Sequence, residues 1–224
     1  MIAPIEQKQT SAWEMYRAIV GIGAFCALVI VGVFQGTAAR IADNQARFLA
    51  GAIAEVLPIT ASTIAVDIAE DGTLAATEEA LPLPVFLAYD EQGELAGAVL
   101  TGQGMGYQDN IRILYAYSFD LAAIVGMKVL DSKETPGLGD RVEIEPHFLA
   151  SFDALDARLN AAGDALANPI VTVKQGEKTE PWHIDGITGA TITSEAIGNI
   201  LNESANEWLP ALERDGASIT QGAP

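Results

Sequence analysis

The chain has 224 residues, half of them hydrophobic, and 30 acidic against 12 basic residues give a net charge of −18. This length fits one globular domain with an appendage, and the hydrophobic content excludes an intrinsically disordered chain. The acidic balance disfavours nucleic acid as a partner, because phosphate binding needs clustered lysines and arginines. One cysteine, Cys26, excludes an intramolecular disulfide, and two histidines, His147 and His183, are too few to favour a metal site. We therefore predict no metal.

An uncharged run of 22 residues occupies positions 18–39, bracketed by Arg17 and Arg40. It reaches the length of about 20 residues with which a helix crosses a bilayer. A core helix this apolar on all sides is rare in a small domain. A cleaved signal peptide is another alternative, with residues 37–39 as the cleavage site. However, the run is longer than the usual apolar segment of about 7–15 residues, so we predict a retained transmembrane helix in the lipid bilayer.

The flanking charges do not orient this helix. Lys8 and Arg17 precede it, and Arg40 and Arg47 follow it, so the positive-inside rule gives a tie. Residues 48–224 contain 27 acidic and 8 basic residues, a net charge of −19. We expect anionic lipid headgroups to repel this part of the chain.

The elements that follow are predicted from hydrophobic periodicity. Helical spacing continues to Pro58, so we expect a helical stalk over residues 40–58. Strands are predicted at residues 63–68, in 84–100 on both sides of a turn at 90–93, at 111–117, at 122–130 with a bulge at Gly126, and at 170–174. Helices are predicted at residues 148–159 and 196–212.

These elements predict an α+β fold: one N-terminal transmembrane helix followed by a single domain, at residues 59–214, with a mostly antiparallel sheet. We expect residues 1–17 to form a segment before the membrane helix and residues 215–224 to form a flexible tail. The sequence has no alternating βαβ units and no G-x-G-x-x-G motif, which disfavours a Rossmann nucleotide site.

Residues 185–194, DGITGATITS, lie directly before the last predicted helix. Three threonines and a serine gather there, and on spacing alone they indicate helix capping, in which hydroxyls accept hydrogen bonds from unpaired N–H groups. The same place also suits a phosphate, because free N–H groups and the helix dipole favour an anion. Gly186 and Gly189 would let the backbone approach a ligand closely. Both interpretations stay open on the residues alone.

DGITGAT resembles the flavinylation motif D-x-x-[ST]-G-A-T of flavin-carrying proteins in Rnf complexes and sodium-pumping NADH:quinone reductases. The match is complete at Asp185, Thr188, Gly189, Ala190 and Thr191. The resemblance implies an FMN-binding domain in which FMN is joined to Thr191 through a phosphoester. It also implies a flavin transferase as a partner during maturation, with FAD as donor, magnesium, and Asp185 required for the transfer.

Residues 133–139, KETPGLG, follow a predicted strand, and their composition alone indicates a surface turn. They resemble the loop that faces the flavin ring in the same family. The resemblance implies polar contacts from Glu134 and Thr135 and close approach of Leu138 and Gly139 to the isoalloxazine. It also implies that Lys174 lies near the phosphate, although a lone lysine is more often a solvated side chain.

Within the family, Gly106-Tyr107 followed by IRILYAY resembles the G subunit of Rnf complexes, and the G-L-W-S stretch usual in the C subunit of the sodium pump is absent. Residues 108–110 depart from the small residues expected there, which weakens a role for this turn in ligand contact. The resemblance implies an electron-relaying flavoprotein with no catalytic residue and no complete reaction of its own. The complex as a whole would be a translocase that couples ferredoxin/NAD electron transfer to ion movement.

The resemblance also implies other membrane and redox proteins of the complex as partners. It further implies an inner-membrane location with residues 1–17 on the cytoplasmic side and the FMN domain on the periplasmic side. Three alternatives stay open. The first is a membrane-anchored binding or assembly module without a redox centre. The second is the C subunit of a sodium-pumping NADH:quinone reductase, and the third is a domain that holds FMN noncovalently.

Overall fold

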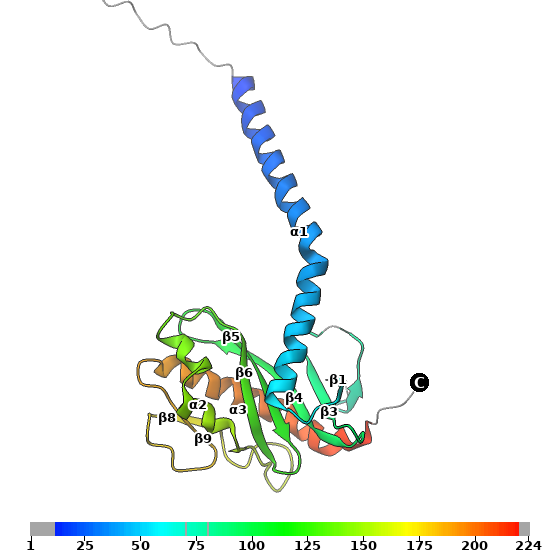
Figure 1. Cartoon of the computed structure of the whole chain (residues 1–224), viewed down its shortest axis with the longest axis vertical. Helices are drawn as coiled ribbons and strands as arrows, with labels where there is room; N and C mark the ends of the chain where they lie inside the picture. Colours follow the sequence, from blue (N-terminus) through cyan, green and yellow to red (C-terminus); the bar gives the residue numbers. More distant parts are fainter. Residues whose placement is uncertain (1–11, 70, 80, 220–224) are drawn as a thin grey trace, which may run out of the picture. The chain divides into compact units, whose positions relative to one another are not determined.

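The computed structural model describes residues 12–69, 71–79 and 81–219 (Figure 1). Contacts divide the chain into two units, Met1–Phe48 and Leu49–Pro224. The predicted N-terminal segment and tail lie partly outside the described residues, at 1–11 and 220–224. Within the predicted tail, Gly216–Ser218 form a short 3-10 helix, η3.

One continuous helix, α1 (Ala12–Val56), contains both the predicted span and most of the predicted stalk. The helix ends two residues before Pro58, as expected because proline cannot continue a helix. Its most apolar window has a mean hydropathy of 2.4 and no buried residue. The helix is therefore long and apolar enough to cross a membrane, which fits a single-pass anchor and also fits a signal sequence.

The second unit is built on an antiparallel sheet with the strand order β2-β1-β3-β4-β5-β6-β7. The strands are β1 (Ser62–Ile68), β2 (Leu74–Ala76), β3 (Val85–Tyr89), β4 (Leu95–Met105), β5 (Asn110–Ser118), β6 (Ala123–Asp131) and β7 (Leu155–Asp156). The predicted strands are confirmed, and β4 runs five residues beyond its expected end. The register of β5 and β6 shifts next to Gly126, which confirms the predicted bulge.

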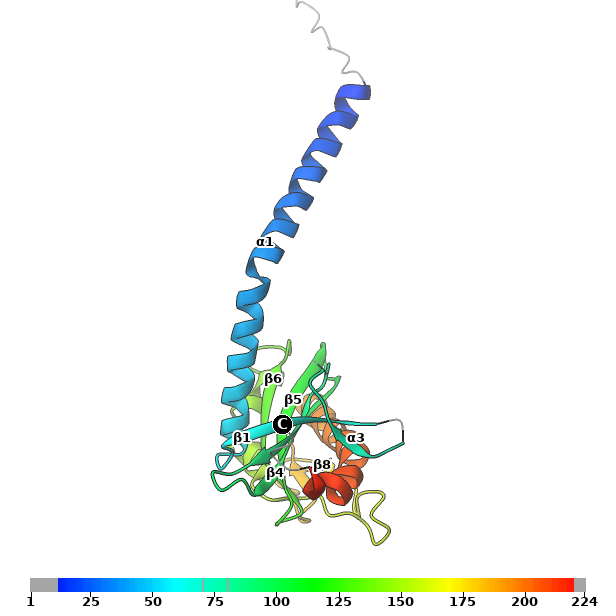
Figure 2. The same ribbon diagram turned by 90° about the vertical axis from the view of Figure 1, so that its right-hand side faces the viewer.

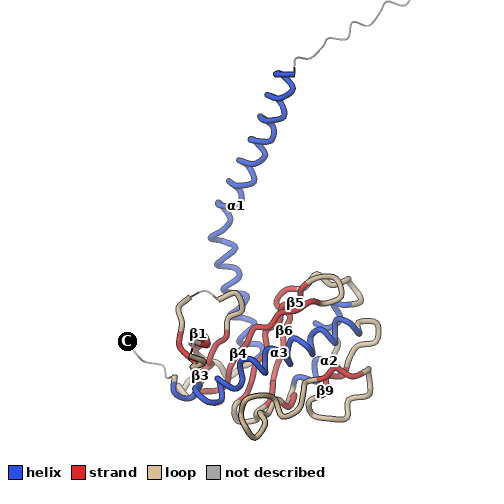
Figure 3. Tube along the Cα trace, turned by 180° about the vertical axis from the view of Figure 1, so that it is seen from behind, coloured by secondary structure: helices blue, strands red, loops and turns tan. Residues whose placement is uncertain are grey.

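Alternating side chains bury both faces of this sheet. On one face, residues such as Leu100, Ile113 and Tyr115 join the main core with α3 (Thr191–Asp215), which covers this face of the sheet in Figures 2 and 3. On the other face, the end of α1 packs Val56 and its neighbours against the sheet. The predicted last helix and the α+β fold class are thereby confirmed.

The prediction of a helix at residues 148–159 is wrong. The chain forms only the short turns η1 (Gly139–Glu143), α2 (Pro146–Leu149) and η2 (Ala150–Phe152) before it extends into β7. Phe148, Phe152 and Leu155 are all buried, and this spacing imitates a helical face. Pairing of Leu155 with Ile124 at the edge of β6 decides the local structure instead.

A second, parallel pair of strands precedes α3. It consists of β8 (Val171–Val173), which was predicted, and β9 (His183–Asp185), which was not. Gly186 N–H donates to Val173 O at 2.9 Å, so the turn into α3 leaves directly from this pair. The residues of the predicted flavinylation motif thus run from the last residue of β9 to the first residue of α3.

Candidate functional site

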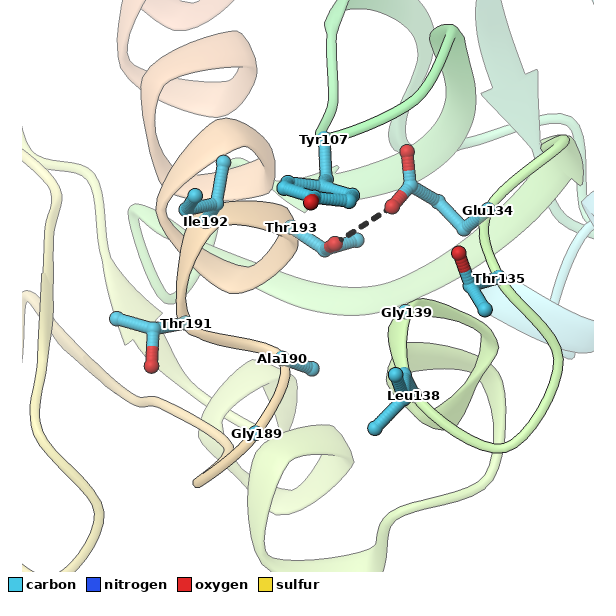
Figure 4. Close-up of a pocket in the computed structure, with 10 residues that line it drawn as sticks. All are labelled: Tyr107, Glu134, Thr135, Leu138, Gly139, Gly189, Ala190, Thr191, Ile192 and Thr193. Carbon is cyan, nitrogen blue, oxygen red and sulfur yellow. Dashed lines mark hydrogen bonds between the residues drawn. The ribbon is translucent and has the colours of Figure 1, made fainter.

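A cavity of about 350 Å³ opens where three separate segments meet: the β4–β5 turn, the loop after β6 and the start of α3 (Figure 4). Its size falls within the range of about 300–1,000 Å³ usual for small-molecule sites. The cavity brings together seven of the predicted site residues: Glu134, Thr135, Leu138, Gly139, Gly189, Ala190 and Thr191. Residues 134–139 and 189–191 are far apart in the sequence, so the fold places the two predicted segments against one cavity.

Three further residues line the cavity but were not predicted as site residues: Tyr107, Ile192 and Thr193. Tyr107 is 66% exposed and Ile192 is 53% exposed, and Leu138 on the opposite wall is 50% exposed. Large apolar side chains exposed together around one cavity indicate a binding surface. The G-Y dipeptide at residues 106–107 was the sequence signal for Tyr107.

The three motif threonines have different environments. Thr193 is 2% exposed, and its hydroxyl donates to Glu134 Oε2 at 2.8 Å. Thr188 and Thr191 are exposed, and neither hydroxyl has a hydrogen-bond partner among the described residues. In Figure 4 the side chains of Thr191 and Thr193 leave the start of α3 in different directions. Thr191 is therefore the accessible hydroxyl at the first position of the helix.

The first turn of α3 has unpaired backbone donors. Ala190 is the N-cap residue and makes no side-chain cap hydrogen bond. Ser194 N–H donates to Ala190 O, but the N–H groups of residues 191–193 have no partner within the described ranges. Helix capping by the motif hydroxyls is thus not what the structure shows. The free donors and the positive end of the helix dipole suit an anion beside Thr191.

The Ser194 hydroxyl instead stabilises the turn itself. It donates to Ala190 O at 2.9 Å and accepts from Ile187 N–H at 3.2 Å. Gly189 has a φ of +88°, a backbone conformation that L side chains rarely adopt. The turn is therefore held from inside by Ser194 and requires glycine at position 189.

A second cavity, of about 620 Å³, lies on the other side of Thr191, which lines both. Lys174, Gln175 and Thr188 are among the residues lining it. Lys174 is exposed and forms no ion pair with any described residue, whereas five of the eight basic residues of the domain do. The structure thus places a cation that has no ion-pair partner among the described residues in a cavity that Thr191 borders.

Asp185 lines neither cavity. Its Oδ1 accepts from Gly176 N–H at 2.6 Å, and its own N–H donates to Ser151 Oγ at 3.0 Å. Asp185 therefore fixes the turn that carries Lys174. Burial lowers the pKa of the neighbouring Lys178, and the negative charge of Asp185 partly offsets this effect.

Glu134 is buried, with 6% of its surface exposed, and both carboxylate oxygens are used inside the protein. Oε1 accepts from Gln108 N–H at 3.0 Å, and Oε2 accepts from the Thr193 hydroxyl. The Thr135 hydroxyl also donates to Gln108 Oε1 at 3.2 Å. Glu134 thus joins all three walls of the cavity. Gln108, one of the three residues that depart from the family pattern, has a structural role in the same network.

Comparison with known proteins identifies the family to which the chain belongs. A sequence model of the FMN-binding domain matches residues 106–206, which include every segment that lines the two cavities. The G subunit of the Na(+)-translocating ferredoxin:NAD(+) oxidoreductase complex of Acetobacterium woodii is 31% identical over 192 residues, 83% of this chain and 85% of the relative. The chain belongs to the family of G subunits of ion-translocating oxidoreductase complexes.

Other G subunits match over similar lengths. That of Methanosarcina acetivorans is 29% identical over 201 residues, 87% of this chain and 93% of the relative. That of Cereibacter sphaeroides is 31% identical over 201 residues, with coverage of 87% and 85%. The crystal structure of the C subunit of the Na(+)-translocating NADH-quinone reductase from Parabacteroides distasonis aligns with a TM-score of 0.55 at 22% identity, covering 69% of this chain and 79% of that chain. This last likeness is one of fold.

Proposed function

We propose that this G subunit holds FMN on Thr191 through a phosphoester and relays electrons between ferredoxin and NAD within an ion-translocating membrane complex. One observation supports this most: an exposed, unpartnered threonine hydroxyl stands at the start of α3, next to N–H donors that are free within the described ranges, where two cavities meet. FMN, when attached, supplies the electron-transfer chemistry, which the side chains around the two cavities do not provide.

The first cavity fits the ring of the flavin. Tyr107, Leu138 and Ile192 offer apolar surface to a planar aromatic ligand. Thr135 and Gly139 lie on the same wall as Leu138, where Gly139 has no side chain to obstruct a close approach. Glu134 is buried behind these walls and accepts hydrogen bonds from Gln108 and Thr193, so its role in the site is to fix the spacing of the walls.

The phosphate fits the helix N-terminus. The N–H groups of residues 191–193 are free to donate within the described ranges, and the helix dipole favours a negative charge at this end. Lys174 supplies a positive charge from the second cavity. Because Thr191 borders both cavities, its hydroxyl can join a phosphate on one side to a ring on the other.

The function is tested by producing the full chain with and without an active flavin transferase. We expect yellow protein only with the transferase, and the visible absorbance should stay with the protein after acid precipitation, because a phosphoester does not dissociate. Colour that is released by acid would favour noncovalent FMN. Colourless, folded protein from the strain with active transferase would favour a binding or assembly module.

We further propose that α1 stays in the mature protein as a single-pass inner-membrane anchor and that the FMN domain faces the periplasm, beside the other proteins of the complex. The length and apolarity of α1 support the anchor. A reporter that works only in the periplasm, fused after Pro224, should be active. A mature N-terminus near Ile41, or activity only of a cytoplasmic reporter, would contradict this topology.

A further inference from the structure

Two side chains outside both cavities, those of Arg141 and His147, contact the turn that carries Thr191, and the Glu145 carboxylate joins them. Arg141 Nη1 donates to the backbone carbonyl of Thr188 at 3.0 Å. His147 Nε2 lies 3.2 Å from the carbonyl oxygen of Gly186. Glu145 lies between them: its Oε2 accepts from Arg141 Nε at 3.2 Å and Nη2 at 2.5 Å, and its Oε1 lies 3.2 Å from His147 Nδ1.

Among the described residues, the hydrogen-bond partners of the two carbonyls are limited to these side chains. Within the described part of the chain, no backbone N–H donates to Gly186 O or Thr188 O, because α3 begins its own pattern only at Ala190 O. The side chains of Arg141 and His147 therefore replace backbone hydrogen bonds at both positions. The bond from Arg141 has a charged donor and is therefore stronger than a neutral one, which suits a turn that secondary structure does not hold.

The network is partly shielded from water. The side chains of Arg141, Glu145 and His147 are 32%, 23% and 26% exposed. The hydrogen bond from Arg141 lowers the pKa of the Glu145 carboxyl below its usual value. Arg141 lies two residues after the loop at residues 134–139, so its hydrogen bond to Thr188 O connects the end of that loop to the turn that leads into α3.

We propose that Arg141 and His147, held in place by Glu145, are positioning residues that fix the turn at residues 186–190 so that the Thr191 hydroxyl is presented for flavin attachment. This inference rests on the proposed function. None of the three side chains lines either cavity, so they act through the turn and not by contact with the flavin. The two carbonyls that they hold lie three and five residues before Thr191.

The test compares Arg141→Met with Arg158→Met in the full chain. Arg158 is a matched control, because it also forms a forked ion pair, with Asp156 at 2.7 and 2.9 Å, and lines neither cavity. Hydrogen exchange is measured first, without flavin. Arg141→Met should speed amide exchange at residues 187–190 about tenfold, whereas Arg158→Met should leave these amides unchanged.

Flavin transfer is measured next, with transferase, FAD and magnesium, as the rate of covalent incorporation per folded protein. Arg141→Met should lower this rate about tenfold, the factor that corresponds to about 1.4 kcal/mol, and should change the visible circular dichroism of the flavin that is attached. Arg141→Lys, which keeps one donor and the charge, should recover part of the rate. Arg158→Met should stay within about twofold of the unaltered protein.

The outcomes separate the two proposals. Unchanged exchange at residues 187–190 in Arg141→Met would overturn the inference whether or not the protein takes flavin. Faster exchange together with an unchanged transfer rate and dichroism would show that the network stabilises the turn without positioning Thr191, which also overturns it. Failure of the unaltered protein to be modified would count against the proposed function, while the exchange result would still decide the structural role of Arg141.

Discussion

Replacing Thr191 with valine is expected to give a folded protein that has no covalent flavin. Valine keeps the shape of threonine and removes the only atom to which the phosphoester would be joined. The Thr191 hydroxyl has no partner among the described residues, so its loss should change the free energy of unfolding by less than about 0.5 kcal/mol. Visible absorbance after acid precipitation measures the flavin, and thermal unfolding measures the stability.

Thr188→Val is the matched control, because Thr188 is also exposed and its hydroxyl is also unpartnered within the described ranges. It should keep the flavin. Thr193→Val should also keep it, at a cost in stability, because Glu134 Oε2 would lose its buried donor. Acid-stable flavin that survives Thr191→Val and disappears in Thr188→Val would show that Thr188 is the acceptor and contradict the proposal.

Glu134→Ala is expected to destabilise the domain by about 2–3 kcal/mol, because it leaves the Gln108 N–H and the Thr193 hydroxyl without their acceptor. For a domain of this size, that corresponds to a decrease in melting temperature of about 5–10 °C. The walls of the first cavity should also separate, since Glu134 joins all three. Differential scanning calorimetry of the protein without flavin measures the decrease in melting temperature directly.

Two further variants test whether the lost hydrogen bonds cause the destabilisation of Glu134→Ala. Glu134→Gln should recover most of the stability, because the amide oxygen can accept from Gln108 and the amide group can donate to Thr193. Glu143→Ala removes an exposed carboxylate with no partner among the described residues and should change the melting temperature by less than about 2 °C. Equal melting temperatures for Glu134→Ala and Glu143→Ala would contradict the role of Glu134 in joining the walls.

Local periodicity predicted most of the fold. Strict alternation indicated the strand at residues 111–117, and one apolar face indicated α3, because burial on one side imposes these periods. It failed at residues 148–159, where Phe148, Phe152 and Leu155 are buried at helical spacing in a segment that is mostly irregular. β9 was missed because three residues, His183–Asp185, have too little pattern to identify a strand.

The candidate site was predicted from two short motifs, and the structure adds what joins them. Thr193 looked like one hydroxyl among four, and its burial against Glu134 depends on a residue 59 positions away. Arg141 and His147 contact the turn across 47 and 39 residues. No spacing rule within a single sequence identifies such contacts, because they arise only when separate elements pack together.

Peptide mass spectrometry of the chain produced with an active flavin transferase tests most directly whether Thr191 is the site of flavin attachment. After acid denaturation and proteolysis, peptides across residues 175–214 are fragmented to locate any added mass. We expect an addition equal to FMN minus one water on Thr191, with Thr188 and Thr193 unmodified. An unmodified Thr191, or the same addition on another residue, would contradict the proposed attachment.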